Sequence, residues 1–163
     1  MLPSSPLKIR PEFGSNMLSR KGLYAVRALV ALAGAYPEGL TTRAIVATHK
    51  LPRKFLEAIL IDLRRAGITD SIRGREGGHR LARPPERISL ADVIRTTDGP
   101  LALMPCASVT SYKECDDCPD VTGCRIRKAF GKGRDALASV FESITLADLA
   151  DRPGTLEALR EAG

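Results

Sequence analysis

The pattern of apolar and polar positions first predicts three helices in close succession. Ser19 is suited to cap a helix that runs to about Tyr36, where Pro37-Glu38-Gly39 ends it. Thr41 or Thr42 is suited to cap a short helix over 43–48, and a third helix begins after Leu51-Pro52 and ends at Gly67. The third helix carries one apolar stripe at helical spacing, made of Phe55, Leu56, Ile59, Leu60 and Leu63.

Two short extended runs follow and predict a β-hairpin. Runs 68–73 and 79–82 flank a glycine-rich turn that bears an arginine, and Pro84-Pro85 closes the hairpin. Three helices followed by a basic hairpin are the parts of a winged helix-turn-helix domain, which we expect over residues 17–87. The fold class is therefore mainly α with a small β-hairpin wing.

The second half of the chain predicts a connecting segment and a long helix. Residues 88–100 form a connecting helix that Ser89 caps and Asp98-Gly99-Pro100 breaks. A loop over 101–123 leads to residues 124–150, which we expect to be a long amphipathic helix followed by a short one. Packing against its copy in a homodimer would bury the apolar stripe of the long helix, and folding back onto its own domain is the alternative.

The two ends of the sequence differ from the rest. Residues 1–16 are polar and rich in Pro and Ser and end in Glu-Phe-Gly-Ser, which is typical of a cloning site. We expect this segment to be an expression-tag leader and residues 151–163 to be a tail. No apolar run is long enough to cross a bilayer and no signal peptide is visible, so we expect a soluble cytoplasmic protein with no membrane partner.

Charge is distributed unevenly along the chain. Residues 20–87 hold 14 Lys and Arg against 6 Asp and Glu, a net charge of +8. Residues 88–163 hold 9 against 12, a net charge of −3. This asymmetry indicates that the first half faces a polyanion, for which double-stranded DNA is the natural candidate. An ordinary basic surface is the alternative.

The third helix supplies the first candidate DNA contacts. In a helix-turn-helix the second helix of the pair enters the major groove with its N-terminal residues toward the bases. Arg53 can reach a guanine edge or a phosphate, and Lys54 a phosphate. Glu57 can accept from cytosine, or equally well form a salt bridge with Arg53 or Lys54.

The hairpin supplies the second set of candidate DNA contacts. Its arginines, Arg73, Arg75 and Arg80, lie around glycines that allow close approach to DNA, and they suit the minor groove. A dimer of such domains would bind a pseudo-palindromic operator with half-sites about one helical turn apart.

All four cysteines of the chain lie within 19 residues, with the spacing Cys106-x8-Cys115-x2-Cys118-x5-Cys124. In a cytoplasmic protein this clustering indicates metal binding or redox chemistry. The spacing leaves three possibilities open: an iron–sulfur cluster, a zinc site, and a Cys115–Cys118 disulfide switch. No thioredoxin-like context or catalytic base accompanies the pair, so we expect no enzyme activity.

Several motifs resemble one known family. They are the run from Leu18 to Leu29, Phe55-Leu-Glu-Ala-Ile-Leu60, the wing Arg73-Gly-Arg-Glu-Gly-Gly-His-Arg-Leu81, and Ile88-Ser-Leu-Ala-Asp-Val-Ile94. The chain resembles the Rrf2 family of bacterial regulators over nearly all of 18–149. The resemblance implies a homodimeric, DNA-binding transcriptional regulator, and we expect a repressor.

The resemblance also bears on the cysteines. Cluster-bearing members such as IscR and NsrR supply three cysteines from this loop, and Cys106, Cys118 and Cys124 match those positions. The resemblance implies a 2Fe–2S or 4Fe–4S cluster, of which we favour 2Fe–2S, that senses iron, redox or nitric-oxide status. Zinc or no metal is the alternative. Cys115 is additional and is the first candidate for a fourth ligand.

Three positions depart from the family pattern. Arg127 stands where IscR-like members have a ligating histidine, and Leu23 stands where some NsrR-like members have a carboxylate. His79 replaces the usual wing tyrosine, and we expect a structural or phosphate-neighbouring role for it.

Overall fold

The computed structural model describes residues 18–150 except 75–76, 117 and 119. The predicted leader and tail, and Arg75, lie outside the described residues. The predicted fold class is confirmed. The described elements are α1 (Arg20–Gly34), α2 (Thr42–His49), α3 (Arg53–Arg65), β1 (Thr69–Ile72), β2 (Gly78–Leu81), α4 (Leu90–Thr97), α5 (Arg125–Ser143) and α6 (Leu146–Leu149), with 3₁₀ turns at Pro85–Arg87 and Pro105–Ala107.

Local side-chain caps set where the helices begin. Ser19, Thr41 and Ser89 each accept a hydrogen bond from a backbone N–H three residues later, at 3.0 to 3.1 Å. These bonds satisfy N–H groups that the first turn of a helix leaves without an intrahelical partner. Three predicted helix starts therefore follow from neighbouring residues alone.

The core lies between α1 and α3. The α3 stripe is buried as predicted, at Leu56, Ile59, Leu60 and Leu63, and Phe55 at its edge packs its ring edge-on against Tyr24 of α1. Burying each aliphatic side chain contributes roughly 1.5–3 kcal/mol. This packing fixes α3 in the domain and leaves its charged face exposed.

The hairpin is antiparallel, and a third segment joins it. Thr69 pairs with Leu81, and Ile72 pairs with Gly78. The backbones of Leu40 and His79 exchange two hydrogen bonds, of 2.8 and 2.9 Å. Gly39 allows this approach, because its φ is +88° and a Cβ there would collide with the His79 carbonyl. The hairpin is thereby fixed to the start of α2.

The short helix α6 packs against the N-terminal core. Leu146 is completely buried there with Ile88. The Leu146 N–H donates to the Ile88 carbonyl at 2.9 Å, and the Leu90 N–H donates to the Ile144 carbonyl at 2.8 Å. The C-terminal end of α5 is therefore attached directly to the DNA-binding half.

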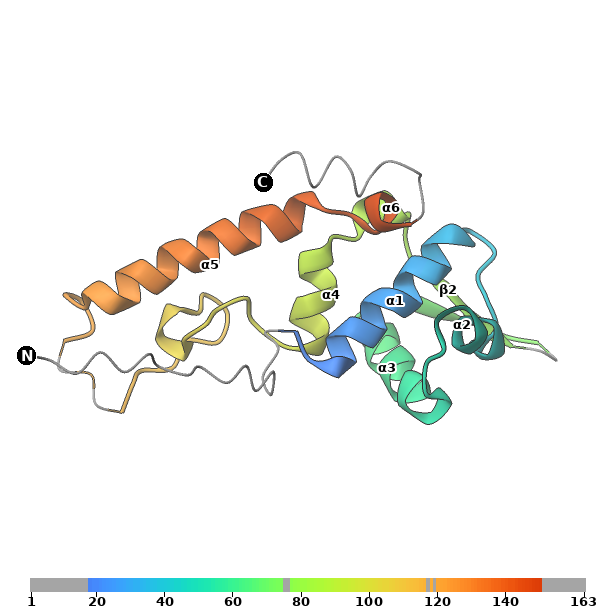
Figure 1. Ribbon diagram of the computed structural model, residues 1–163, viewed down its shortest axis with the longest axis horizontal. Helices are drawn as coiled ribbons and strands as arrows, with labels where there is room; N and C mark the ends of the chain where they lie inside the picture. Colours follow the sequence, from blue (N-terminus) through green and yellow to red (C-terminus); the bar gives the residue numbers. More distant parts are fainter. Residues whose placement is uncertain (1–17, 75–76, 117, 119, 151–163) are drawn as a thin grey trace, which may run out of the picture.

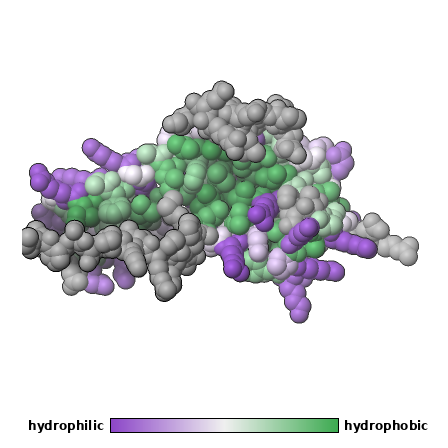
Figure 2. Space-filling view, viewed as in Figure 1, coloured by the Kyte–Doolittle hydropathy of each residue, from purple (hydrophilic) through white to green (hydrophobic). Residues whose placement is uncertain are grey.

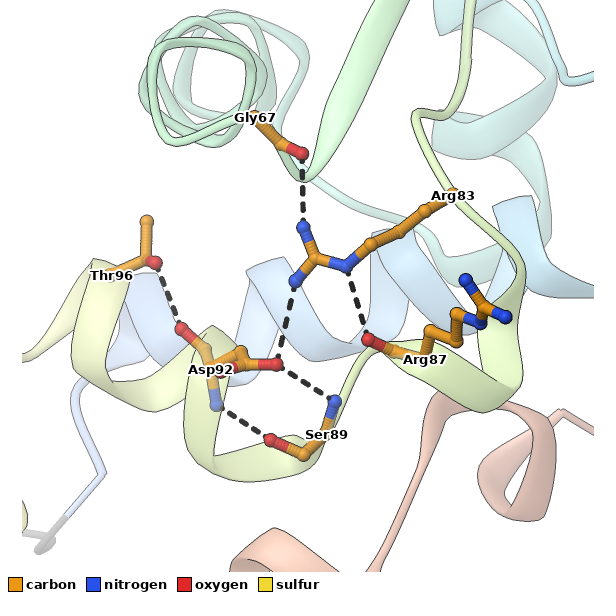
Figure 3. Close-up of polar contacts among 6 residues, drawn as sticks. All are labelled: Gly67, Arg83, Arg87, Ser89, Asp92 and Thr96. Carbon is orange, nitrogen blue, oxygen red and sulfur yellow. Dashed lines mark hydrogen bonds and ion pairs between the residues drawn. The ribbon is translucent and has the colours of Figure 1, made fainter.

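Arg83 joins the end of α3 to the start of α4 (Figure 3). Its guanidinium donates to the Gly67 carbonyl at 3.2 Å and to the Arg87 carbonyl at 3.0 Å. It also lies 3.4 Å from the carboxylate of Asp92, which accepts the Ser89 N–H in the capping box of α4. One side chain thus connects the end of α3 with the start of α4.

Figure 1 shows an elongated molecule with the hairpin at one end and the long helix α5 extending toward the other. The segment between α4 and α5, which holds the cysteines, runs alongside α5 and away from the hairpin. Within the described residues, no helix is both long and apolar enough to cross a membrane.

Candidate DNA interface and cysteine pocket

The N-terminal end of α3 presents an ion pair at the surface. Arg53 Nε lies 2.9 Å from Glu57 Oε1, and these side chains are 71% and 48% exposed. Lys54 beside them is also exposed. The salt-bridge alternative for Glu57 is therefore the arrangement in the free protein, and both charged groups still face outward.

The hairpin presents further basic side chains. Arg73 and Arg80 are exposed, and Arg80 Nε lies 4.0 Å from a carboxylate oxygen of Asp70. His79, next to Arg80, is only partly buried, but its Nδ1 atom is enclosed and has no hydrogen-bond partner among the described residues. Burial lowers the pKa of His79, and the nearby charge of Arg64 lowers it further. His79 thus belongs to the packed base of the wing.

The four cysteines come together although three different local structures position them. The 3₁₀ turn Pro105–Ala107 buries Cys106, which is 6% exposed. Cys124 caps α5, and its Sγ accepts the Arg127 N–H at 3.4 Å. Cys115 and Cys118 flank a turn in which the Cys118 N–H donates to the Cys115 carbonyl at 3.2 Å. All four line one cavity of about 200 Å³.

Arg127 holds this cavity together. Its Nε donates to the Cys106 carbonyl at 3.0 Å and its Nη1 donates to the Val121 carbonyl at 3.2 Å. The guanidinium also lies over the ring of Tyr112, 5.3 Å from the ring centre. The arginine that stands in place of a ligating histidine therefore connects both ends of the cysteine segment to α5.

The neighbouring Cys106 raises the pKa of the Cys115 thiol, and burial and the nearby Cys118 and Cys124 raise it further. All four cysteines are free. Cys115 and Cys118, which the sequence paired as a possible dithiol, lie on one turn at the wall of the cavity.

Two supports of the pocket were missed from the sequence. Asp120 Oδ1 accepts the N–H groups of Thr122 at 2.9 Å and Gly123 at 3.0 Å, and these bonds lower the pKa of Asp120. Arg134 donates to the Ala107 carbonyl at 2.5 Å. The Asp-x-Thr-Gly order was a usable turn signal, but nothing local reveals the contact of Arg134.

The chemistry of the donor set fits a thiolate-bound metal centre. In the part of the chain that the structure describes, no group of three or more His, Cys, Asp or Glu side chains is placed to hold one metal ion. All four cysteines line the cavity, and thiolates are ligands both of structural zinc and of iron–sulfur clusters.

An uncovered apolar face runs along α5. None of its 19 residues, all of them described, is buried, and Ile126 and Val140 are 60% and 54% exposed. Figure 2 shows a broad hydrophobic area in the middle of the molecule. Between α1, α4 and α5 lies a cavity of about 420 Å³ whose lining includes Leu23, Ile94 and Phe141.

The fold and the exposed basic face define the protein as a winged-helix DNA-binding regulator. Residues 18–152 match the Rrf2 family, described as an iron-dependent transcriptional regulator, and the chain belongs to this family. Its members are transcriptional regulators and not enzymes.

Three relatives illustrate the match. An Rrf2-like HTH-type transcriptional regulator of Rhodobacter capsulatus is 42% identical over 137 residues, which cover 82% of this chain and 91% of the relative. CymR, the global cysteine regulator of B. subtilis, has a structure that matches with a TM-score of 0.66 at 31% identity, over 83% of this chain and 97% of CymR. The structure of T. potens IscR matches with a TM-score of 0.63 at 32% identity, over 92% of each chain.

Proposed function

We propose that this protein is a homodimeric transcriptional repressor that senses iron, redox or nitric-oxide status through an iron–sulfur cluster bound by its four cysteines. One observation carries the proposal: Cys106, Cys115, Cys118 and Cys124 line a single cavity. The winged-helix domain supplies the DNA-binding activity that such a sensor would control. As a transcriptional regulator, it would act in the cytoplasm.

Four cysteines provide a complete ligand set without help from another residue type. Arg127 has no lone pair available to bind a metal, and its guanidinium donates hydrogen bonds to two carbonyl groups. Cys115 lines the same cavity and takes the fourth ligand position in this proposal. When bound, the cluster would supply one-electron redox chemistry and reactivity toward oxygen or nitric oxide, and a 2Fe–2S cluster is the form we favour.

The surroundings of the cavity suit an anionic cluster. The N-terminal end of α5, which carries the positive end of the helix dipole, lies at the cavity, where Cys124 Sγ accepts the Arg127 N–H. The Arg127 guanidinium adds a fixed positive charge at the cavity wall.

The DNA contacts follow from the exposed basic residues. Arg53 and Lys54 would enter the major groove with α3. Glu57 would break its ion pair with Arg53 and accept a hydrogen bond from cytosine. The hairpin arginines Arg73, Arg75 and Arg80 would contact phosphates or the minor groove. Replacing Arg53 or Arg73 with alanine should weaken operator binding and reduce its dependence on salt.

A dimer accounts for the uncovered face of α5. Pairing of two copies would bury Ile126, Val140 and the cavity beside Leu23, removing apolar surface from water. The dimer would also present two winged-helix domains to a pseudo-palindromic operator whose half-sites are about one helical turn apart.

Anaerobic purification tests the cluster directly. The protein should absorb in the visible range and contain iron and acid-labile sulfide, and Cys115→Ser should lose both to the same degree as Cys118→Ser. Equal iron in Cys115→Ser and the parent protein would show that Cys115 is not a ligand. Stoichiometric zinc without sulfide would replace the cluster with a structural zinc site.

A further inference from the structure

We propose that a second cavity of this protein, next to the cysteine cavity, binds a small divalent oxyanion of the sulfate or phosphate type. The cavity has a volume of about 210 Å³ and lies between the N-terminal half of α5 and the turn that holds Ala107 and Ser108. The inference goes beyond the proposed cluster and does not depend on it, because it uses no thiol.

The lining of this cavity carries an excess of positive charge. Arg127, Lys128 and Arg134 of α5 contribute to it, and none of the described residues that line it is acidic. Arg134 pairs with Asp135, whereas Arg127 and Lys128 form no ion pair within the part of the chain that the structure describes. Like charges held close together repel one another. An anion with two negative charges would offset this repulsion better than chloride or a single carboxylate.

Helical spacing leaves room for a ligand between the two arginines. Arg127, Gly131 and Arg134 follow one another at intervals of four and three residues, so they share one face of α5. A Cβ on Gly131 would meet no described atom within 4 Å. The helix surface between the two arginines is therefore open, although glycine is a poor residue for the middle of a helix.

Backbone carbonyl groups already position both guanidinium groups. Arg127 Nε donates to the Cys106 carbonyl at 3.0 Å, and Arg134 Nη1 donates to the Ala107 carbonyl. Carbonyl groups are uncharged, so these bonds orient the arginines without neutralising them. A guanidinium has five N–H donors, so each arginine keeps further donors for a ligand. Because the arginines are held in advance, binding an anion costs less side-chain entropy.

Ser108 adds a neutral donor to the cavity. This residue is only 6% exposed, and its Oγ accepts the Ser111 N–H at 3.0 Å. A hydroxyl group that accepts a hydrogen bond keeps its own proton to donate. The Thr122 hydroxyl, in the same lining, donates to Asp120 at 2.8 Å and is already engaged. The ligand groups are thus three cations and the Ser108 hydroxyl.

The cavity lies on a different side of α5 from the uncovered apolar face. Successive residues of a helix are about 100° apart around its axis, so Arg127 lies about 100° from Ile126. A dimer that pairs through Ile126 and Val140 should therefore leave the cavity accessible to a small anion.

Isothermal titration calorimetry tests the site on full-length, anaerobically purified protein. Sodium sulfate, sodium phosphate and sodium acetate are titrated separately, and sodium chloride keeps the ionic strength constant. We expect saturable binding of one sulfate or phosphate per chain and no saturation with acetate. The separate titrations decide between the two divalent anions.

Two variants and one matched control locate the binding. Lys128→Gln removes a charge from the lining, and Gly131→Leu fills the space between the arginines. Each should weaken binding at least about tenfold. Lys132→Gln removes the same charge from an exposed residue of α5 outside the lining and should leave the affinity unchanged. Thermal melting followed by circular dichroism checks that Gly131→Leu is folded, and Lys128→Gln decides alone if it is not.

Several results would overturn the site. They are heats that do not saturate, equal affinities in Lys128→Gln and Lys132→Gln, and undiminished binding by folded Gly131→Leu. Acetate that binds as tightly as sulfate and phosphate would overturn the assignment to a divalent anion. Iron and sulfide contents are measured separately, so none of these results bears on whether the cysteines bind a cluster.

Discussion

The Arg127 guanidinium donates to the carbonyl oxygen of Cys106 across 21 positions of sequence, at 3.0 Å. The same group reaches Val121 near the other end of the cysteine segment. Both ends of the segment are therefore fixed to the first turn of α5 by one side chain.

Replacing Arg127 with glutamine should loosen the cysteine segment without unfolding the DNA-binding domain. Each lost charged hydrogen bond contributes about 1.5–3 kcal/mol, so open forms of the segment become more than tenfold more populated. We expect the cluster absorbance to decay several-fold faster in air, while the urea midpoint of the main core stays the same. Lys128→Gln removes the same charge from an exposed neighbour and should change neither value. Equal decay in the two variants would contradict the role of Arg127.

Arg83 offers a test of the connection between α3 and α4. Arg83→Ala removes bonds to Gly67, Arg87 and Asp92 and should lower the free energy of unfolding by about 1–2 kcal/mol. Arg83→Lys should restore little of the lost free energy of unfolding, because a single ammonium group cannot reach all three acceptors. The free energy is measured by urea unfolding, with Arg87→Ala as the exposed control. A full rescue by lysine would show that charge alone matters.

Gly22 should resist a change that usually stabilises helices. Replacing glycine with alanine inside a helix gains about 1 kcal/mol in general. At Gly22, however, a Cβ would collide with the Asp98 carboxylate, which accepts the Ser19 N–H at 3.1 Å. Gly22→Ala should therefore lower the melting temperature.

The matched control for Gly22 lies in the same helix. A Cβ at Gly34 has open space around it, so Gly34→Ala should raise the melting temperature or leave it unchanged. Combining Gly22→Ala with Asp98→Ala removes the colliding carboxylate, and the double variant should be more stable than the sum of the two single changes predicts. Strict additivity would count against the contact.

His79 should make stability depend on pH. Its pKa is lowered in the folded protein by burial and by Arg64, so the unfolded chain binds a proton more readily. Stability from this residue is complete above the unfolded pKa of about 6.5 and is lost as the pH falls below it. Urea unfolding at pH 7.5 and pH 5.5 should show a smaller loss in His79→Gln than in the parent protein. The same loss in both would exclude His79 as the cause.

The sequence was sufficient for the parts of this structure that depend on neighbouring residues. Ser19, Thr41 and Ser89 start their helices through bonds to residues three positions away, and the α3 stripe reveals its buried face by spacing alone. The turn between the hairpin strands is recognisable from its glycines. Resemblance to a known family then identified the arrangement as a winged helix.

Contacts between distant residues could not be predicted in this way. Leu146 packs in the core over a hundred residues after α1 begins, and neither α6 nor its surroundings signals this contact. Cys106 shares its cavity with three cysteines that follow a chain reversal, at which the Lys113 N–H donates to the Pro105 carbonyl, and the local residues carry no strong turn signal for this reversal.

The uncovered face of α5 provides a test of the proposed dimer. Val140→Glu places a charge on the exposed apolar stripe and should shift the protein to a monomer in sedimentation experiments, with operator affinity at least tenfold weaker. Ser139→Glu adds the same charge one position away, about 100° around the helix, and should affect both properties much less. A dimer that tolerates Val140→Glu would show that this part of α5 is not the interface.

The most direct test of the central claim compares operator binding by cluster-loaded and metal-free protein. Both forms come from one anaerobic preparation, and binding is measured against DNA from upstream of the protein's own gene at fixed salt. The account predicts affinities that differ by tenfold or more, and no such difference in Cys124→Ser. Equal affinities for two forms that differ in measured iron and sulfide would contradict it.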